Sequence, residues 1–172
     1  MSFLWDLLGG TLWGKILVTL IISMVPVIEL RGAIPVAVLL HDMDPILALA
    51  LSVIGNMLPV PFIIVFIRTV FQWIRNRIPK LNRLIDRLEE KGRSKRKTVE
   101  KYGFWGLFLF VAIPLPGTGA WTGALIAAML DMRLKRAFPS ILLGVITAGI
   151  IVTVLVSAGL AAYVGFTASF LL

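Results

Sequence analysis

Cysteine is absent from the 172 residues, and histidine occurs only once. Without cysteine the chain can form no disulfide, no thiol nucleophile and no cysteine-rich metal cluster, so we expect neither a metal nor a cofactor. Acidic residues are scarce as well, because nine Asp and Glu stand against 17 Lys and Arg, which gives a formal net charge of +8. No nucleophile, base and orienting group occur together in the sequence, and we therefore do not expect an enzyme.

A basic leader is also missing from the start of the chain. Residues 1–6 contain neither Lys nor Arg, whereas a cleaved signal peptide opens with a basic region. We therefore expect the N-terminus to be retained. Residues 1–14 are too few to cross a bilayer, and Gly9 and Gly10 weaken a helix there. We expect an interfacial helix in the membrane plane, and the alternative is a frayed terminus.

Hydrophobic residues make up 59% of the chain, and its mean hydropathy is +0.96. Values this high are typical of integral membrane proteins, and the length suits one domain, so we predict a single all-α membrane domain over residues 1–172. Two apolar segments are long enough to cross a bilayer as helices: residues 45–74, and residues 137–172 with length to spare. At Gly159 or Gly165 the second segment could turn off into a short interfacial helix.

Proline and glycine interrupt two other apolar stretches. The first contains Pro26-Val27-Ile28-Glu29-Leu30-Arg31-Gly32-Ala33-Ile34-Pro35, and the second contains Pro114-Leu115-Pro116-Gly117-Thr118-Gly119. Hydrocarbon offers peptide groups no partner, so a broken backbone at membrane depth survives only where it is buried in protein or lines a wet cavity. We interpret the stretches as broken hairpins, over residues 15–41 and 104–130, and as the candidate working site. The first stretch alone could also be one broken span.

Residues 75–103 form a strongly polar segment. Between residues 75 and 101, eleven Lys and Arg stand against four Asp and Glu. The apolar spacing at residues 81–88 predicts an amphipathic helix in part of it. The segment suits docking to anionic lipid headgroups, and the alternative is a solvated cytoplasmic loop. Aromatic residues do not alternate with the charges, so we do not expect nucleic acid binding.

The basic connectors orient the chain. Lys and Arg in short loops stay in the cytoplasm, so we place residues 75–101 and 131–136 inside, and the second hairpin then begins and ends on one side. Similar residues recur 89 positions apart: Asp42 and Asp131, Met43 and Met132, Ala48 and Ala137, Gly55 and Gly144. A unit repeated after one crossing is inverted. We therefore predict two inverted repeats, each a re-entrant hairpin followed by a transmembrane helix, with both termini outside.

A family resemblance rests on two stretches, Glu29-Leu30-Arg31-Gly32-Ala33-Ile34-Pro35 and Ala112-Ile113-Pro114-Leu115-Pro116-Gly117-Thr118-Gly119-Ala120-Trp121. They resemble segments of the small multidrug export proteins, relatives of the DedA family of SNARE-associated, VTT-like membrane proteins. The resemblance covers the chain from about residue 16 to the last helix. It implies two oppositely oriented re-entrant hairpins. In DedA relatives it also implies transport of lipid phosphates such as undecaprenyl phosphate, coupled to protons.

The resemblance also implies a carboxylate in the first hairpin, which Glu29 matches, and arginines beside the proline of the second, where this sequence has Val111 and Gly117. Arg31 and the turn Gly117-Thr118-Gly119 offer a substitute, because N–H groups at the start of a half-helix favour an anion. We expect these residues and Trp121 to bind substrate and Glu29 to carry the coupling proton. The alternatives are that Glu29 and Arg31 only neutralise each other and that Trp121 fills the bundle.

Four further residues are secondary candidates. Asn56 would lie in a membrane helix, where a polar side chain more often bonds another helix than a substrate. Arg68 marks the far end of the first span, where its long stem can reach the interface. Asp42 and Asp44 would line the outer mouth beside the lone histidine, which we expect to be solvated rather than a metal ligand.

Three functions remain open. The first is a transporter of an anionic lipid phosphate, which uses Arg31 for the headgroup and Glu29 for proton coupling. The second is a proton-coupled exporter of cationic hydrophobic drugs at Glu29, for which a neighbouring arginine is unfavourable. The third is a membrane-organising protein that transports nothing. So few crossings would shield the broken hairpins poorly, and we therefore expect a homodimer.

Overall fold

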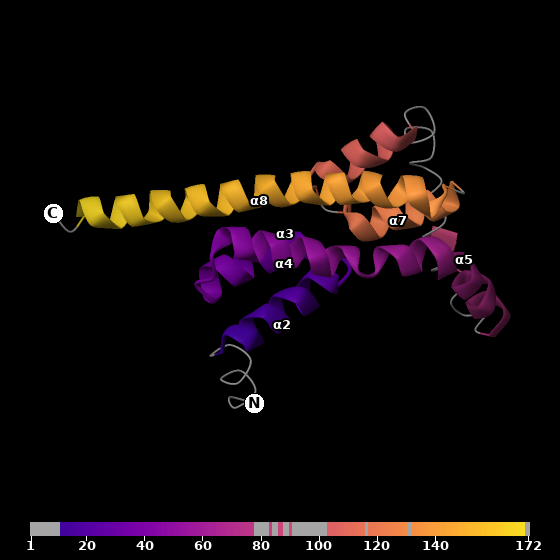
Figure 1. The fold of residues 1–172 in the computed structure, drawn as a ribbon, viewed down its shortest axis with the longest axis horizontal. Helices are drawn as coiled ribbons and strands as arrows, with labels where there is room; N and C mark the ends of the chain where they lie inside the picture. The colour runs from indigo at the N-terminus through magenta and orange to yellow at the C-terminus, as the bar shows by residue number, and fades with distance from the viewer. Residues whose placement is uncertain are drawn as a thin grey trace. The chain divides into compact units, whose positions relative to one another are not determined.

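The structure is a computed structural model that describes residues 11–77, 83, 86, 87, 90, 103–115, 117–130 and 132–170, with side chains except at residues 68–72, 74, 75 and 162–170. Within these ranges every regular element is a helix, and there is no strand (Figure 1). The predicted all-α class is therefore confirmed. The predicted interfacial helix at the N-terminus and the predicted amphipathic helix of the basic segment lie largely outside the described residues.

The helices follow the apolar stretches of the sequence. The first hairpin region comprises α2 (Leu12–Met24), α3 (Glu29–Pro35) and the π-helix η1 (Val36–Leu40). Next come α4 (Pro45–Met57) and α5 (Val60–Arg77). The second hairpin region comprises the helix Gly103–Ala112 and α7 (Ala120–Met129), and α8 (Leu134–Phe170) follows it.

Short polar side chains start two of these helices. The Thr11 hydroxyl accepts a hydrogen bond of 3.1 Å from the N–H of Gly14 and caps α2. The Asp44 carboxylate accepts hydrogen bonds from the N–H groups of Ile46 and Leu47 and caps α4. Such caps satisfy backbone donors that a helix leaves open at its N-terminus, so the connectors fix where these helices begin.

Proline and glycine break the helices at three places. Residues 25–28 interrupt the first hairpin, and residues 113–115 and 117–119 interrupt the second. Between α4 and α5 the helix stops at Met57, because Pro59 has no N–H to donate to the carbonyl four residues earlier. The apolar segment that the sequence presents as one span therefore contains two helices.

The helices form two compact units. Unit 1 consists of Met1–Asn56 and Ile146–Leu172, and unit 2 consists of Met57–Val145. Unit 1 holds the first hairpin and α4, and unit 2 holds α5 and the second hairpin. α8 contributes its first part to unit 2 and the remainder to unit 1.

Unit 1 is built on a helical hairpin. α2 packs against α3 and η1, and the Lys15 ammonium near the start of α2 donates a hydrogen bond of 2.6 Å to the carbonyl of His41, just after η1. The chain therefore enters and leaves this hairpin at the same end. α4 lies close against it, because a Cβ atom at Gly55 would collide with the Leu20 carbonyl and with Ser23. Only glycine allows this approach.

The later part of α8 completes unit 1. Gly149 of α8 lies against Leu49 and Val53 of α4 and against Ile34 of α3. Ile34 is fully buried. α3, α4 and α8 therefore share one apolar core within unit 1.

In unit 2 the start of α8 runs along the first helix of the second hairpin. The Ser140 hydroxyl donates a hydrogen bond of 2.7 Å to the carbonyl of Phe104. One turn further on, Gly144 lies against Val111 and the carbonyl of Phe108. Because the later residue of α8 contacts the later residue of the helix Gly103–Ala112, the two helices run in the same direction.

α7 is the other arm of the second hairpin. A short connector joins it to α8, so it runs opposite to α8 and to the helix Gly103–Ala112. Gly123 of α7 lies against Val111 and Leu107 of that helix, and α5 packs against α7. The second hairpin is thus covered by α5 and by the start of α8.

The two units have similar helix contacts, and their boundaries are separated by the same 89 residues as the similar residues in the sequence. The first segment of unit 1 ends at Asn56, and unit 2 ends at Val145, 89 residues later. Gly55 and Gly144 are separated by the same 89 residues and take equivalent places, because each meets the backbone of the first helix of its own hairpin. The sparse sequence match therefore reflects a shared arrangement of helices.

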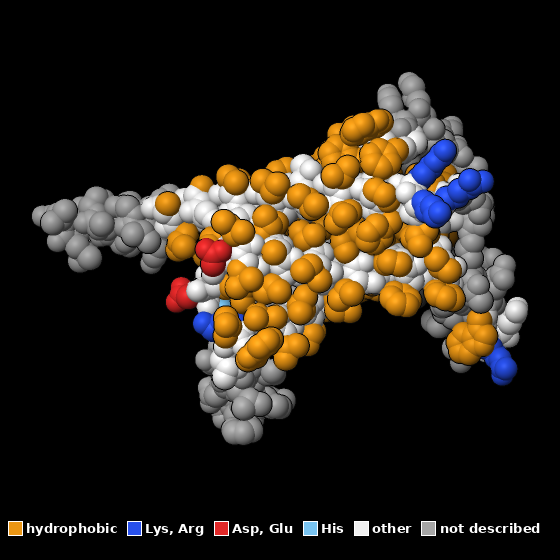
Figure 2. All heavy atoms as spheres, viewed as in Figure 1, with side chains coloured by type: hydrophobic (Ala, Val, Ile, Leu, Met, Phe, Trp, Pro, Cys, Tyr) orange, Lys and Arg blue, Asp and Glu red, His pale blue; other side chains and the backbone are white. Residues whose placement is uncertain are grey.

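Among the described residues, two segments are long and apolar enough to cross a membrane, Pro45–Ile67 and Leu134–Ala161. Large hydrophobic side chains are exposed along both, such as Ile46, Phe62 and Leu155, and apolar side chains cover much of the visible surface (Figure 2). Exposed charges lie instead at the ends of these segments: Asp42 and Asp44 before α4, Arg77 at the end of α5, and Arg133, Lys135 and Arg136 around the start of α8.

Candidate functional site

Glu29 lies at the tip of the first hairpin, where it is the first residue of α3 and only 4% exposed. The backbone around it is unusual, because Val27 has a φ of 81° and Glu29 a φ of 51°. Side-chain-bearing residues seldom adopt this left-handed region. Each such residue costs on the order of 1–3 kcal/mol, and strain of this kind clusters at functional sites. Asp42 also has a positive φ, of 48°, but it is exposed, so a left-handed backbone and a buried charge coincide at the tip of the first hairpin.

Arg31 follows two residues later in α3 and is partly buried. The Glu29 carboxylate acts electrostatically on the Arg31 guanidinium. The structure thus brings together the two charges of the first motif. An opposite charge only partly offsets the cost of removing a charge from water, so a buried ion pair need not stabilise the fold. The pair is therefore compatible with a functional site as well as with a structural link.

Two hydroxyl groups of α2 are fully buried in unit 1. The Thr19 hydroxyl donates a hydrogen bond of 2.8 Å to the carbonyl of Lys15, and the Ser23 hydroxyl donates one of 2.8 Å to the carbonyl of Leu20. Both bonds return to the helix that carries the hydroxyl. The protons of these two groups are therefore occupied within α2.

The last two turns of α4 carry two buried polar side chains whose atoms lack partners. Ser52 and Asn56 are both 0% exposed. Neither the Ser52 Oγ nor the Asn56 Oδ1 and Nδ2 has a hydrogen-bond partner among the described residues. Asn56 is a secondary candidate from the sequence, whereas Ser52 was missed. The signal was present, because residues four apart lie on one face of a helix.

Glu29 and Asn56 lie at similar positions along the axes of the neighbouring helices α3 and α4 in unit 1. A short connector makes α4 run opposite to α3 and η1, and Ile34 of α3 and Val53 of α4 both meet Gly149. At about 1.5 Å per residue, the step from Ile34 back to Glu29 covers about 7.5 Å, and the step from Val53 on to Asn56 covers about 4.5 Å in the same direction. The backbone positions of Glu29 and Asn56 therefore differ by only about 3 Å along the helix axes.

The second break, in unit 2, is a turn around Thr118. The Thr118 hydroxyl donates to the carbonyls of Ile113, at 2.6 Å, and Leu115, at 2.8 Å, and accepts from the N–H of Leu115 at 3.3 Å. Gly117 has a φ of 80°, which favours glycine. Gly119 is the N-cap of α7 and makes no side-chain cap bond. The structure brings this predicted triplet together, but its hydroxyl is engaged in the turn itself.

Trp121 lies in the first turn of α7 and is partly buried. It follows the turn directly, as the sequence requires. Arg31, however, belongs to unit 1, whereas the turn and Trp121 belong to unit 2. The anion pocket that combines them stays a prediction from the sequence.

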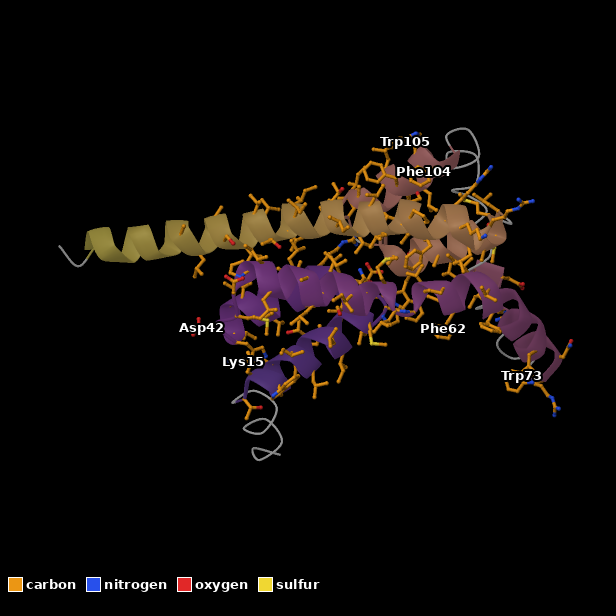
Figure 3. All side chains as sticks on the ribbon, viewed as in Figure 1. Lys15, Asp42, Phe62, Trp73, Phe104 and Trp105 are labelled. Carbon is orange, nitrogen blue, oxygen red and sulfur yellow. The ribbon has the colours of Figure 1, made fainter. Side chains whose placement is uncertain are left out.

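The secondary candidates are more peripheral. Asp42 and Asp44 are exposed in the connector before α4, and Asp42 lies at the same end of unit 1 as Lys15 (Figure 3). His41 is only 9% exposed, although the sequence favours a solvated side chain. No three His, Asp or Glu side chains gather closely enough to hold a metal ion in the described part of the chain. Arg68 lies in α5, and its side chain is not described.

A family model described as "Putative small multi-drug export protein" matches residues 29–151. The match covers well over half of the 172 residues. The chain belongs to this family. No curated protein and no solved structure matched the chain. Membership in a family of export proteins agrees with the two apolar segments long enough to cross a bilayer, so the protein is a membrane protein.

The match to the small multi-drug export family covers the residues that stand out in the structure. It begins at Glu29, directly after the break in the first hairpin, and it includes the break in the second hairpin as well as Ser52 and Asn56. All of α2 and the outer part of α8 lie beyond it. The tip of the first hairpin and the end of α4 are therefore part of what this chain shares with the family model.

Proposed function

We propose that the protein exports small hydrophobic cations and exchanges them for protons at Glu29. The observation that carries this proposal is the 4% exposure of this carboxylate at the tip of the first hairpin. A charge at membrane depth is costly, so carboxylates there are rare and mark the paths of ions and substrates. The description of the family as small multi-drug export proteins supports export as the direction.

A single carboxylate explains how the two movements are coupled. Glu29 can bind a proton or pair with a cationic cargo, but it cannot do both at once. Arg31 serves the state in which neither is bound, because its guanidinium interacts electrostatically with the carboxylate. It is only partly buried, and a long arginine stem can move its charge toward water when the cargo arrives.

The proposal includes a membrane arrangement. Both hairpins are re-entrant, and the two units are inverted repeats in the cell membrane, with residues 75–101 and 131–136 in the cytoplasm. There the basic segment meets anionic lipid headgroups. The protein works as a homodimer and catalyses no reaction.

A second candidate is transport of an anionic lipid phosphate such as undecaprenyl phosphate, as in DedA-like proteins. The observation that favours it is the start of α7, where the N-cap is Gly119, which has no side chain, and where the positive end of the helix dipole suits an anion. Arg31 would supply the balancing cation, and Trp121 would lie beside the headgroup. A membrane-organising protein that transports nothing is the remaining alternative.

Reconstitution into liposomes tests the proposal. With a pH gradient imposed, we expect the wild-type protein to move a cationic dye and to leave labelled undecaprenyl phosphate in its leaflet. Glu29→Gln should reduce dye movement to the level of empty liposomes, because glutamine releases no proton. Glu90→Gln is the matched control, since it removes an exposed carboxylate outside the hairpins and should transport normally.

Each other outcome contradicts the proposal in a distinct way. Movement of the lipid without the dye would support the second candidate. Movement of neither would support the membrane-organising protein. Dye transport by Glu29→Gln that still responds to the pH gradient would exclude Glu29 as the exchanging group.

A further inference from the structure

The end of α4 contains polar atoms that the fold of the described residues does not use. The Asn56 side chain has two donor hydrogens and an acceptor oxygen, and the Ser52 hydroxyl can donate and accept. Both residues are 0% exposed, and none of these atoms has a partner in the described part of the chain. A buried polar group without a partner is costly, and most of all in a membrane helix. Such atoms indicate a ligand.

The second unit shows that packing does not need these polar groups. The offset of 89 residues places Ile141 opposite Ser52 and Val145 opposite Asn56. Ile141 is 0% exposed and Val145 is 1% exposed, so the equivalent places in unit 2 are just as buried but apolar. A hydroxyl and an amide have replaced apolar side chains in only one of two similar frameworks.

The chemistry of this place suits a cation. Asn56 lies in the last turn of α4, where the helix dipole is negative. The carbonyl of Gly55 cannot accept the usual helical bond, because Pro59 has no N–H. Ser52 and Asn56 add neutral oxygens, and Glu29 lies at a similar height with one carboxylate.

The kind of cation follows from the same groups. Oxygen ligands without nitrogen or sulfur select hard cations. One negative charge among neutral oxygens balances a monovalent ion rather than a divalent one. Broken membrane helices that coordinate Na⁺ use the same combination of helix C-terminal carbonyls and side-chain oxygens.

We propose that unit 1 binds Na⁺ at the end of α4, through the Ser52 Oγ, the Asn56 Oδ1 and the carbonyl of Gly55, with Glu29 supplying the negative charge. The site deepens the proposed function, because Na⁺ would be a second coupling ion beside the proton. Only this coupling role rests on the proposed function. Binding itself is independent of what the protein exports.

Thermal unfolding of the purified full-length protein in detergent tests the site. The melting temperature is measured in NaCl, KCl and choline chloride at equal ionic strength. We expect Na⁺ to raise it with the logarithm of the Na⁺ concentration above Kd, by about 5–10 °C at a hundredfold excess over Kd, because a ligand that binds only the folded state stabilises it. K⁺ should have at most a small effect.

Substitutions locate the effect. Asn56→Val copies the equivalent residue of unit 2, and it should abolish the response to Na⁺ while leaving the melting temperature in choline chloride unchanged or higher. Ser52→Ala should weaken the apparent Na⁺ affinity at least about tenfold, because even the loss of a group that only orients a metal ligand typically costs 10–100-fold in affinity. Ser140→Ala is the control, because it removes a buried hydroxyl from unit 2 and should keep the full response to Na⁺.

Equal melting temperatures of the wild-type protein in NaCl and choline chloride would overturn the site, and so would a full Na⁺ response in Asn56→Val. Dye transport in Na⁺-free liposomes separates the two proposals. If a pH gradient drives that transport while Na⁺ has no effect on melting, the Na⁺ site fails and the proposed function stands. If Na⁺ stabilises the protein but neither dye nor protons move, the proposed function fails and the site stands.

Discussion

Units 1 and 2 have the same framework but differ in what they bury. In each, two helices form a broken hairpin, and a glycine brings the following helix against its first arm. At equivalent positions, however, unit 1 buries Glu29 and Asn56, whereas unit 2 has Thr118, bonded within its own turn, and the apolar Val145. The framework therefore does not require polar groups. The proposed ion chemistry therefore depends on side chains that unit 1 has and that the equivalent positions of unit 2 lack.

The glycines that the two units share predict the largest effects on the free energy of unfolding. Gly55→Ala and Gly144→Ala should each lower the free energy of unfolding by about 2–3 kcal/mol, because the added Cβ would collide with the first helix of the hairpin. Denaturant unfolding in detergent measures both. Gly159→Ala is the control, since a Cβ there meets nothing within 4 Å. If only one of the two variants is destabilised, the glycines are not equivalent.

The difference between the units predicts that exchanging the side chains at positions 56 and 145 has unequal effects on stability. Val145→Asn buries an amide in unit 2, where no ligand is expected, and should lower the free energy of unfolding by about 2 kcal/mol. The reverse change at Asn56 should cost nothing in the absence of Na⁺. Unfolding in choline chloride measures the two variants side by side. Equal losses in both would mean that unit 1 satisfies its amide within the protein.

The smallest effects concern how each unit fixes the start of its hairpin. Lys15→Met removes the hydrogen bond to the carbonyl of His41, and Ser140→Ala removes the one to the carbonyl of Phe104. Each change should lower the free energy of unfolding by about 1 kcal/mol, the typical net value of one hydrogen bond. Amide hydrogen exchange can locate each effect. Faster exchange confined to α2 in the first variant and to the helix Gly103–Ala112 in the second would show that the units open separately.

Much of the helical plan follows from the sequence, because it depends on strong local signals. Hydrophobicity predicts the membrane helices, and the prolines and glycines predict both hairpin breaks, since they alter backbone hydrogen bonding directly. The offset between Gly55 and Gly144 indicates the shared framework. The division of the first span into α4 and α5 is less evident, because proline in an apolar helix can either bend it or end it.

The site is only partly visible in the sequence. Glu29 and Arg31 stand out because charge is rare in apolar stretches. Ser52 does not, because a serine in a membrane helix usually bonds back to its own backbone, as Ser23 does here. Whether a hydroxyl is free or engaged depends on packing, and this is also why the sequence overestimates the availability of Thr118.

Each unit is completed by a segment from the opposite half of the chain. Ile146–Leu172 joins the unit of the first hairpin, and residues 57–77, which precede it by 89 positions, join the unit of the second. A polypeptide with a single copy of this motif could cover its hairpin only by borrowing the trailing helix of a second molecule.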